Sequence, residues 1–220
     1  MVFCFQNISR LGILNPLIFI DSPSTGMSNR PFKRGPYLRV IQRMLVHEKC
    51  FRQILNNGAI LEERPFANGC AMMISRECLD RVGFFNEEFF MYGVDPEYCF
   101  RSRQNGFLSM VLLNEQACVV HHKGMAQKPW RTFFDARNQF LFLRLFCLSK
   151  QVLIFLVFFG SLAERIIHFI RKKKPLSALY HVRGFCAGLR IWVRDLLGRS
   201  EPGKYLLEEK VSFQRLRKRH

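Results

Sequence analysis

Acidic and histidine side chains at two places in the chain could transfer a proton or bind a metal ion. Asp95-Pro96-Glu97 opens a predicted helix, where Asp is a good N-cap, Pro suits the first position and Glu suits the positive end of the helix dipole. A carboxylate at a helix mouth can also face a cleft. His121 ends a predicted strand, where a histidine is either a metal ligand or a solvated or hydrogen-bonded group. Taken alone, the local sequence favours structural roles over chemistry for Asp95, Glu97 and His121.

The elements that would position these groups follow from hydrophobic patterning and cap residues. Predicted strands cover residues 11–20, interrupted by Asn15-Pro16, and residues 70–74, 110–113 and 117–120; predicted helices cover residues 37–55, 76–82 and 95–105. The pattern is helical and mostly apolar from Phe133 onward. We therefore predict an α/β fold with a mixed sheet and flanking helices over residues 1–132, followed by an α-helical, basic tail over residues 133–220.

An ordered series of motifs occupies the middle of the chain. Residues 68–76 read NGCAMMISR, residues 82–97 read VGFFNEEFFMYGVDPE, and an R-x-x-x-x-G helix end, a V-V-H triplet and Arg137-Asn138 follow. In this order and spacing the series resembles the second half of family 2 glycosyltransferases, most closely the rhamnosyltransferase-like and galactofuranosyltransferase-like members. The resemblance implies a GT-A-like sheet. We interpret the Arg137-Asn138 pair as a source of hydrogen bonds between a helix and the core.

The resemblance also implies a reaction, which is inverting transfer of a sugar from a nucleotide-sugar donor to an acceptor hydroxyl. A base must remove the hydroxyl proton, and the family's motif assigns that role to Asp95. A divalent ion, Mg²⁺ or Mn²⁺, normally neutralises the leaving diphosphate, and the motif makes His121 a candidate ligand. A single histidine does not hold such an ion, because these ions prefer several oxygen ligands.

Five further residues are candidate substrate contacts. Gly69, Cys70 and Ala71 look like the small residues that let a donor sugar approach the backbone, although a packed strand explains them almost as well. Tyr92 could stack on a sugar ring, with ordinary packing as the default. Glu97 could contact the acceptor, and its alternative role is that of a first-turn helix acid.

The chain departs from the family pattern in three respects. Val94 replaces the first acid of the Glu-Asp pair, and Asn86 replaces the aspartate of the Phe-Asp-Glu triplet. The sequence contains no D-x-D, and in the family that acidic loop and the nucleotide-binding strands come before the segment resembled here. We therefore expect an N-terminally truncated form that is inactive alone. The alternative is a non-catalytic membrane-surface or scaffold protein derived from a glycosyltransferase.

The positive charge of the chain is concentrated in its last 50 residues. Residues 171–220 hold 14 Lys and Arg and four Asp and Glu, so they supply +10 of the formal net charge of +17. The apolar run of residues 152–170 precedes them and contains Glu164 and Arg165, which disfavour a membrane-spanning helix. We expect this region to bind an anionic membrane surface peripherally, with a soluble helix packed on the first domain as the alternative. No recognisable nucleic-acid module is present.

The eight cysteines are scattered and form no C-x-x-C pair. We interpret them as reduced core residues, and we find no signal-peptide pattern in the first residues. These observations favour a cytoplasmic location at the inner face of the cell membrane. The expected partners are a nucleotide-sugar donor, a glycan or lipid-linked acceptor in surface polysaccharide synthesis, and anionic lipid.

Overall fold

A computed structural model describes residues 1–22, 26–28, 52–122, 128–146 and 148–199. The chain forms two compact units. The first contains residues 1–85 and 95–127, and the second contains residues 86–94 together with the helices from residue 128 onward. The short segment of residues 86–94 therefore belongs with helices that follow it by more than 30 residues. Each unit is described separately below.

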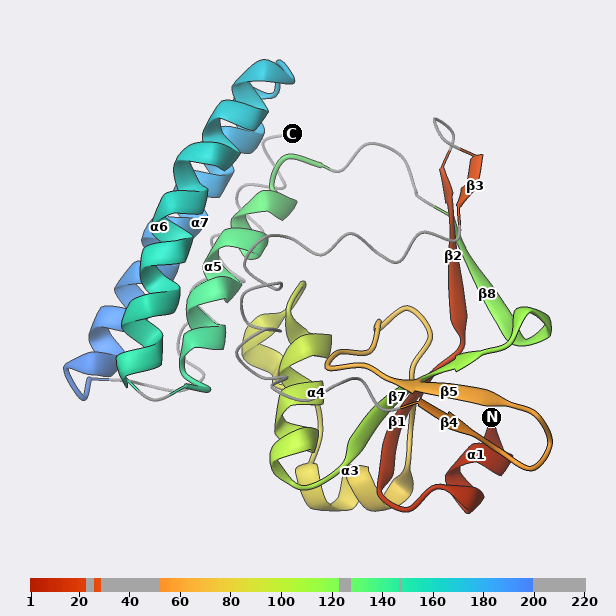
Figure 1. Ribbon diagram of the computed structural model, residues 1–220. Helices are drawn as coiled ribbons and strands as arrows, with labels where there is room; N and C mark the ends of the chain where they lie inside the picture. Colours follow the sequence, from red (N-terminus) through yellow and green to blue (C-terminus); the bar gives the residue numbers. More distant parts are fainter. Residues whose placement is uncertain (23–25, 29–51, 123–127, 147, 200–220) are drawn as a thin grey trace. The chain divides into compact units, whose positions relative to one another are not determined.

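The first unit is built on a mixed sheet, which confirms the predicted α/β class (Figure 1). In the described residues this sheet has five strands in the order β4-β5-β7-β1-β6. They are β4 (Arg52–Ile54), β5 (Ile60–Glu63), β7 (Leu108–Leu113), β1 (Leu11–Asn15) and β6 (Met73–Ile74). The strands β1 and β7 are parallel, and the other neighbours are antiparallel. Ile13 and Leu14 of β1 are fully buried, as a central strand requires.

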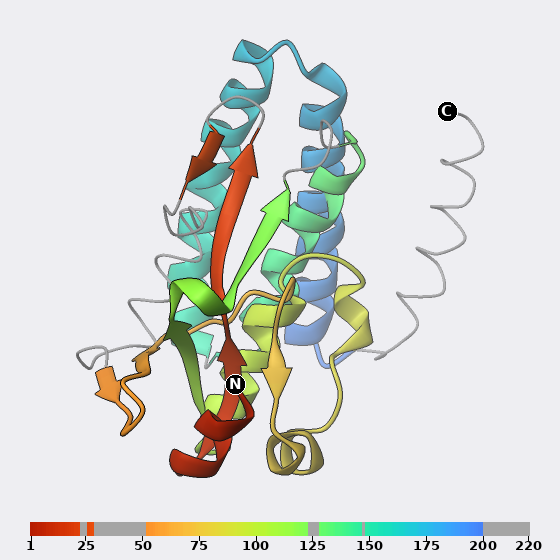
Figure 2. The same cartoon turned by 90° about the vertical axis from the view of Figure 1, so that its right-hand side faces the viewer.

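A second sheet continues the same two strands. After Pro16 the chain enters β2 (Leu17–Ser22), which pairs in parallel with β8 (Cys118–His122) and antiparallel with β3 (Gly26–Ser28). Proline lacks a backbone N–H, so the ladder of β1 ends at Asn15. Figure 2 shows β1 leading into β2 and β7 leading into β8. The predicted interruption at Asn15-Pro16 is confirmed.

Among the described residues, three α-helices flank the sheets of this unit: α1 (Val2–Asn7), α3 (Arg76–Val82) and α4 (Val94–Gln104). The bounds of α3 match the prediction, because Ser75 caps it by accepting a hydrogen bond from the Cys78 N–H and Gly83 ends it at φ +83°. The helix α4 begins at Val94, one residue earlier than predicted, so Asp95 lies inside its first turn. The short 3₁₀ segment η2 (Glu115–Ala117) joins β7 to β8.

Three expectations about this unit need correction. Residues 52–54, predicted as the end of a helix over 37–55, form β4, and residues 37–51 of that helix lie outside the described residues. The strand predicted over residues 70–74 is reduced to the two residues of β6. Cys70 and Cys118 are exposed rather than in the core, as is Cys186 of the second unit, whereas Cys4, Cys78 and Cys99 are buried.

The second unit is helical, as predicted for the C-terminal region. It contains η1 (Glu87–Phe89), α5 (Arg131–Leu143), α6 (Leu148–Arg171) and α7 (Pro175–Leu196), and α6 runs antiparallel to its two neighbours (Figures 1 and 2). The contact of α7 with α5 depends on glycines. A Cβ at Gly184 would lie 2.1 Å from the Phe133 carbonyl oxygen, and a Cβ at Gly188 would lie 2.4 Å from the Phe140 ring. The two helix backbones are therefore close enough to exclude any side chain at these positions.

Candidate functional site

The loop of residues 68–71 is held at the carboxyl end of β1 by one buried amide side chain. Asn15, the last residue of β1, is 2% exposed. Its Nδ2 donates hydrogen bonds to the carbonyl oxygens of Asn68 (3.0 Å) and Ala71, and its Oδ1 accepts one from the Asn68 N–H (2.8 Å). A buried carboxamide needs such partners on both its nitrogen and its oxygen. The end of β1 therefore fixes the loop that lies between β5 and β6.

Asp95 closes this loop from the other side. Its Oδ2 accepts a hydrogen bond from the Gly69 backbone N–H at 3.1 Å, although the two residues are 26 positions apart. The first turn of α4 also stabilises the Asp95 carboxylate, because the positive end of the helix dipole lies there. A Cβ at Gly69 would lie 3.4 Å from the Asp95 Cβ, so only a very small side chain leaves the carboxylate uncovered. Gly69 and Asp95, predicted separately from two motifs, lie together.

Cys70 and Ala71 complete the same loop. The Cys70 N–H donates to the Asn68 side chain at 3.2 Å, and the Ala71 N–H donates to the Asn68 carbonyl at 3.3 Å. Partial burial raises the pKa of the Cys70 thiol above its usual value, and the negative charge of Asp95 raises it further. The structure thus brings together four of the predicted residues: Gly69, Cys70, Ala71 and Asp95.

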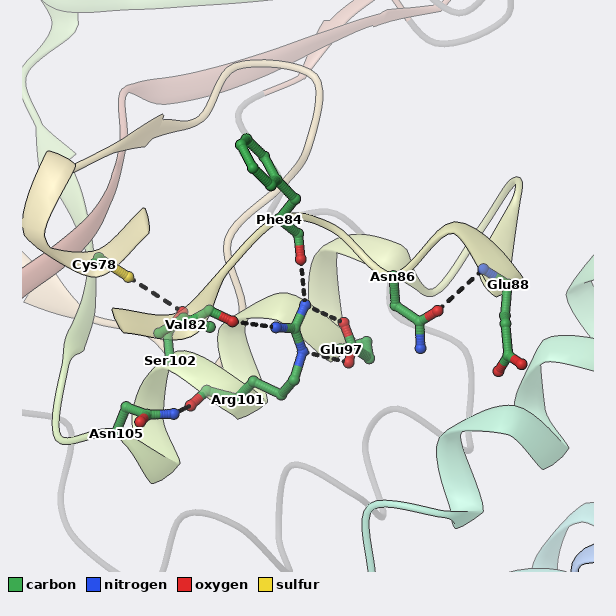
Figure 3. Close-up of polar contacts among 9 residues, drawn as sticks. All are labelled: Cys78, Val82, Phe84, Asn86, Glu88, Glu97, Arg101, Ser102 and Asn105. Atoms are coloured by element: carbon green, nitrogen blue, oxygen red, sulfur yellow. Dashed lines mark hydrogen bonds and ion pairs between the residues drawn. The ribbon is translucent and has the colours of Figure 1, made fainter. Parts of the chain in front are cut away.

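Glu97 forms an ion pair with Arg101 (Figure 3). Its carboxylate is 2% exposed and accepts two hydrogen bonds from the Arg101 guanidinium, at 2.5 and 3.1 Å. The same guanidinium donates to the carbonyl oxygens of Val82 (2.7 Å) and Phe84 (2.9 Å). Glu97 and Arg101 therefore fix the segment after α3, and this geometry favours the structural role of Glu97 over contact with an acceptor.

His121 lies in β8, with its backbone opposite Ile20 of β2, and it is exposed. Within the described ranges, no three His, Cys, Asp or Glu side chains come close enough together to hold a metal ion. The described residues therefore do not fit a divalent-metal site by themselves, and the role of His121 as a ligand stays a prediction.

Tyr92 belongs to the second unit, in a loop with unusual backbone angles. Phe90, Tyr92 and Gly93 all have positive φ, a region that side-chain-bearing residues rarely adopt. Asn138 of α5 holds the loop by donating from Nδ2 to the carbonyl oxygens of Phe89, Met91 and Tyr92, at 2.5–2.7 Å. The network of Asn138 gives Tyr92 a fixed backbone but does not test the predicted contact with a sugar ring.

Arg137 supports the same loop from a fully buried position. Its guanidinium donates to the Glu88 carbonyl oxygen at 2.7 Å and to the Asn138 side chain at 2.8 Å. Burial lowers the pKa of Arg137 to about 10. The interpretation of the Arg137-Asn138 pair as a source of helix-to-core hydrogen bonds agrees with these contacts.

Two residues of the site could not be selected from their sequence signal. Asn15 lies between an apolar run and a proline, a pattern that indicates only the end of a strand. Arg101 is a basic residue in the last turn of a helix, which is ordinary for a cation near the negative end of the dipole. Asn15 binds groups more than 50 residues further along the chain, and Arg101 binds the Val82 and Phe84 carbonyl oxygens in addition to Glu97, which lies one turn away in the same helix.

The first unit is an α/β unit in which the Asp95 carboxylate accepts a hydrogen bond from the backbone of a loop that contains Gly69. No family model matches the chain, and no solved structure matches it. The chain is similar to the low-salt glycan biosynthesis hexosyltransferase Agl10 of Haloferax volcanii, with 31% identity over 83 residues. The match covers 34% of this chain and 25% of that protein, so the chain spans about a quarter of the length of the curated relative it matches. This similarity indicates a relationship to a glycosyltransferase.

Proposed function

We propose that the chain provides the acceptor side of a glycosyltransferase, in which Asp95 is the general base. The observation that carries the proposal is the hydrogen bond from the Gly69 N–H to the Asp95 carboxylate, in a loop held at the carboxyl end of β1, which pairs in parallel with β7. In open α/β sheets, ligands bind outside the carboxyl ends of the strands. The relationship to a hexosyltransferase supports a sugar as the transferred group.

In the proposed reaction an acceptor hydroxyl attacks the anomeric carbon of a nucleotide-sugar. A new C–O bond forms as the bond from the anomeric carbon to the diphosphate oxygen breaks, with inversion at that carbon. The hydroxyl proton moves to Asp95, and the electron pair of the broken bond leaves with the nucleoside diphosphate. General bases of this kind accelerate transfer by about 10²–10⁴-fold.

The loop of residues 68–71 suits the close approach of the donor sugar to the Asp95 carboxylate. All four of its backbone N–H groups are hydrogen-bonded, so the loop is rigid before any ligand arrives. Gly69 and Cys70 are exposed, and the missing side chain at Gly69 leaves room for a sugar ring beside the Asp95 carboxylate. Rigid placement of both reactants is a large part of the rate of such reactions.

The proposal extends to the donor, the acceptor and the kind of glycan that is made. The family 2 resemblance supports a nucleotide-sugar donor, a glycan or lipid-linked acceptor and a place in surface polysaccharide synthesis. We assign no step to a divalent metal, because in the part of the chain that the structure describes no cluster of three metal-binding side chains occurs. Mg²⁺ or Mn²⁺ at His121 would need further oxygen ligands.

The test is a sugar-transfer assay on the Asp95→Asn variant. The carboxamide keeps an oxygen that can accept the Gly69 N–H but takes up no proton, so the base is lost while the loop contact survives. We expect transfer to fall about 100-fold or more. The matched control is Asp80→Asn on α3, an exposed aspartate whose partner is Arg76.

The assay compares the 220-residue chain alone with the chain joined to the nucleotide-binding half of a hexosyltransferase, using a panel of radiolabelled nucleotide-sugars. Transfer that needs Asp95 but not Asp80 supports the proposal. Transfer that survives Asp95→Asn within about tenfold, roughly 1.4 kcal/mol of barrier, excludes the base assignment. Absence of transfer in the joined protein favours the non-catalytic alternative, a membrane-surface or scaffold protein.

A further inference from the structure

The helix α6 has an uncovered apolar face between residues 152 and 170. Val152, Leu156, Phe159, Ile167 and Ile170 are 47–63% exposed, and they recur at the spacing that places side chains on one face of a helix. Ala163, also exposed, fills the gap between them. We call these six residues the α6 stripe. From residue 152 to 170 it extends about 27 Å.

The opposite face of α6 is packed within its own unit. Ile154 and Phe158 are at most 1% exposed, and Phe155 stacks on Trp192 of α7 at 4.9 Å between ring centroids. Arg165 lies 3.8 Å from the Asp135 carboxylate of α5. The orientation of α6 about its axis is therefore fixed by α5 and α7, and the α6 stripe is the face they leave open.

A run of positive charge adjoins the end of the α6 stripe. Arg171, Lys172, Lys173 and Lys174 form the turn between α6 and α7, and all four are exposed. Residues 171–194 contain seven Lys and Arg and no Asp or Glu. Leu176 and Leu179 follow at the start of α7 and are 50% and 47% exposed. Exposed apolar and cationic groups thus follow one another directly where α6 ends and α7 begins.

We propose that the α6 stripe and the turn of residues 171–174 dock together on an anionic lipid surface, with α6 lying in the plane of the interface. The apolar side chains would enter the acyl boundary while the four cations meet lipid phosphates, which is the known arrangement of interfacial helices. The charge selects lipid over a second copy of the chain, since two such turns brought together would repel each other. This inference does not depend on the proposed sugar transfer.

The same surface argues against a helix that crosses the membrane. By length and composition, residues 150–171 are sufficient to span a bilayer. However, α7 packs antiparallel along α6 and exposes Arg183 near the middle of its length and Arg190 two turns further on. If α6 crossed the bilayer, Arg183 would lie near its centre, where charged groups are strongly disfavoured. An interfacial position leaves both arginines in water.

The test is flotation of the full chain with vesicles of phosphatidylcholine alone or with 30% phosphatidylglycerol, at low and high salt. We expect binding only to the anionic vesicles, and weaker binding at high salt. Replacing residues 171–174 by glutamine should weaken binding roughly a hundredfold or more. The matched control removes four exposed cations elsewhere, with Arg52, Arg76, Arg81 and Lys128 replaced by glutamine, and should bind within about threefold of the native chain.

A second pair of variants tests the α6 stripe. Leu156→Glu with Ile167→Glu should reduce binding at least about tenfold, because two charges would enter the acyl boundary. Ile54→Glu with Phe84→Glu adds the same charge at positions that are 68% and 80% exposed in the other unit, and should leave binding nearly unchanged. Circular dichroism checks that each variant is folded.

Four results would overturn the proposal. Equal binding to neutral and anionic vesicles would remove the electrostatic part, and binding that survives the stripe variants would remove the apolar part. A dimer seen by light scattering that the stripe variants abolish, without vesicle binding by the native chain, would make a second copy the occupant. Membrane association that resists alkaline extraction would show that α6 spans the bilayer.

Discussion

Replacement of Asn15 by alanine should release the loop that holds Gly69 against Asp95. The side chain of Asn15 makes three hydrogen bonds to this loop, two as donor and one as acceptor, from a position that is 2% exposed. At about 1 kcal/mol each, these bonds contribute roughly 3 kcal/mol to keeping the loop closed. The change should therefore raise the population of the open loop on the order of a hundredfold.

Hydrogen exchange measures this opening directly. The backbone N–H groups of residues 68–71 are all hydrogen-bonded, so each should exchange on the order of a hundredfold faster in Asn15→Ala. Asn15→Asp separates the contributions, because it keeps the acceptor for the Asn68 N–H and replaces the donor with an oxygen that faces two carbonyl oxygens. We expect it to be at least as damaging as alanine.

The matched control is Asn105→Ala, which removes a single exposed hydrogen bond to the Arg101 carbonyl in the same unit. Exchange of residues 68–71 should not change in that variant. If Asn15→Ala accelerates their exchange less than about fivefold, which corresponds to about 1 kcal/mol, Asn15 does not hold the loop and the site has another anchor.

Two further predictions concern Cys70 and the helical unit. Asp95→Asn removes a negative charge that raises the pKa of Cys70, so the pKa should fall and alkylation of Cys70 at pH 8 should become about two- to fivefold faster. Exposed Cys186 should react as before, and mass spectrometry of labelled peptides measures both rates. Unchanged reactivity of Cys70 would contradict the proximity of Cys70 and Asp95. Gly184→Ala should destabilise the second unit by roughly 2–3 kcal/mol, because its Cβ would meet the Phe133 carbonyl, whereas Gly160→Ala meets nothing and should stabilise α6 by up to about 1 kcal/mol. Urea unfolding followed by tryptophan fluorescence checks both glycine variants, since both tryptophans belong to this unit, and equal effects would refute the packing argument.

Sequence reasoning succeeded where the determinants of structure are local. The helix α3 has the predicted bounds because Ser75 and Gly83 at its ends act through adjacent backbone groups. The strand β4 was mispredicted as helix because the apolar spacing of the residues before it was extended through Leu55, whereas pairing with β5 decides its structure. The Asn-Asn-Gly turn between β4 and β5, with Gly58 at φ +77°, was the available signal for a hairpin.

The candidate site shows the same limit. The motif resemblance selected Gly69 and Asp95, but only the fold shows that a hydrogen bond joins them. The available signal around Glu97 was Arg101 four residues later, which is the spacing of an ion pair along a helix, but this spacing does not show that the carboxylate is buried. Asn15 was interpreted as a strand end, since its partners lie more than 50 residues further along the chain.

The membership of residues 86–94 in the helical unit has a consequence for how such a gene can be divided or recombined. Asn138 and Arg137 are encoded more than 40 codons after the loop whose carbonyl groups they bind, and residues of the other unit are encoded between them. A single crossover near codon 128 would bring in new helices but leave the old loop. The incoming helices would then have to suit a loop with three positive-φ residues that they did not evolve with. The loop and α5 should therefore be inherited as a matched pair, and swaps of the C-terminal helices should succeed only when codons 86–94 are exchanged with them.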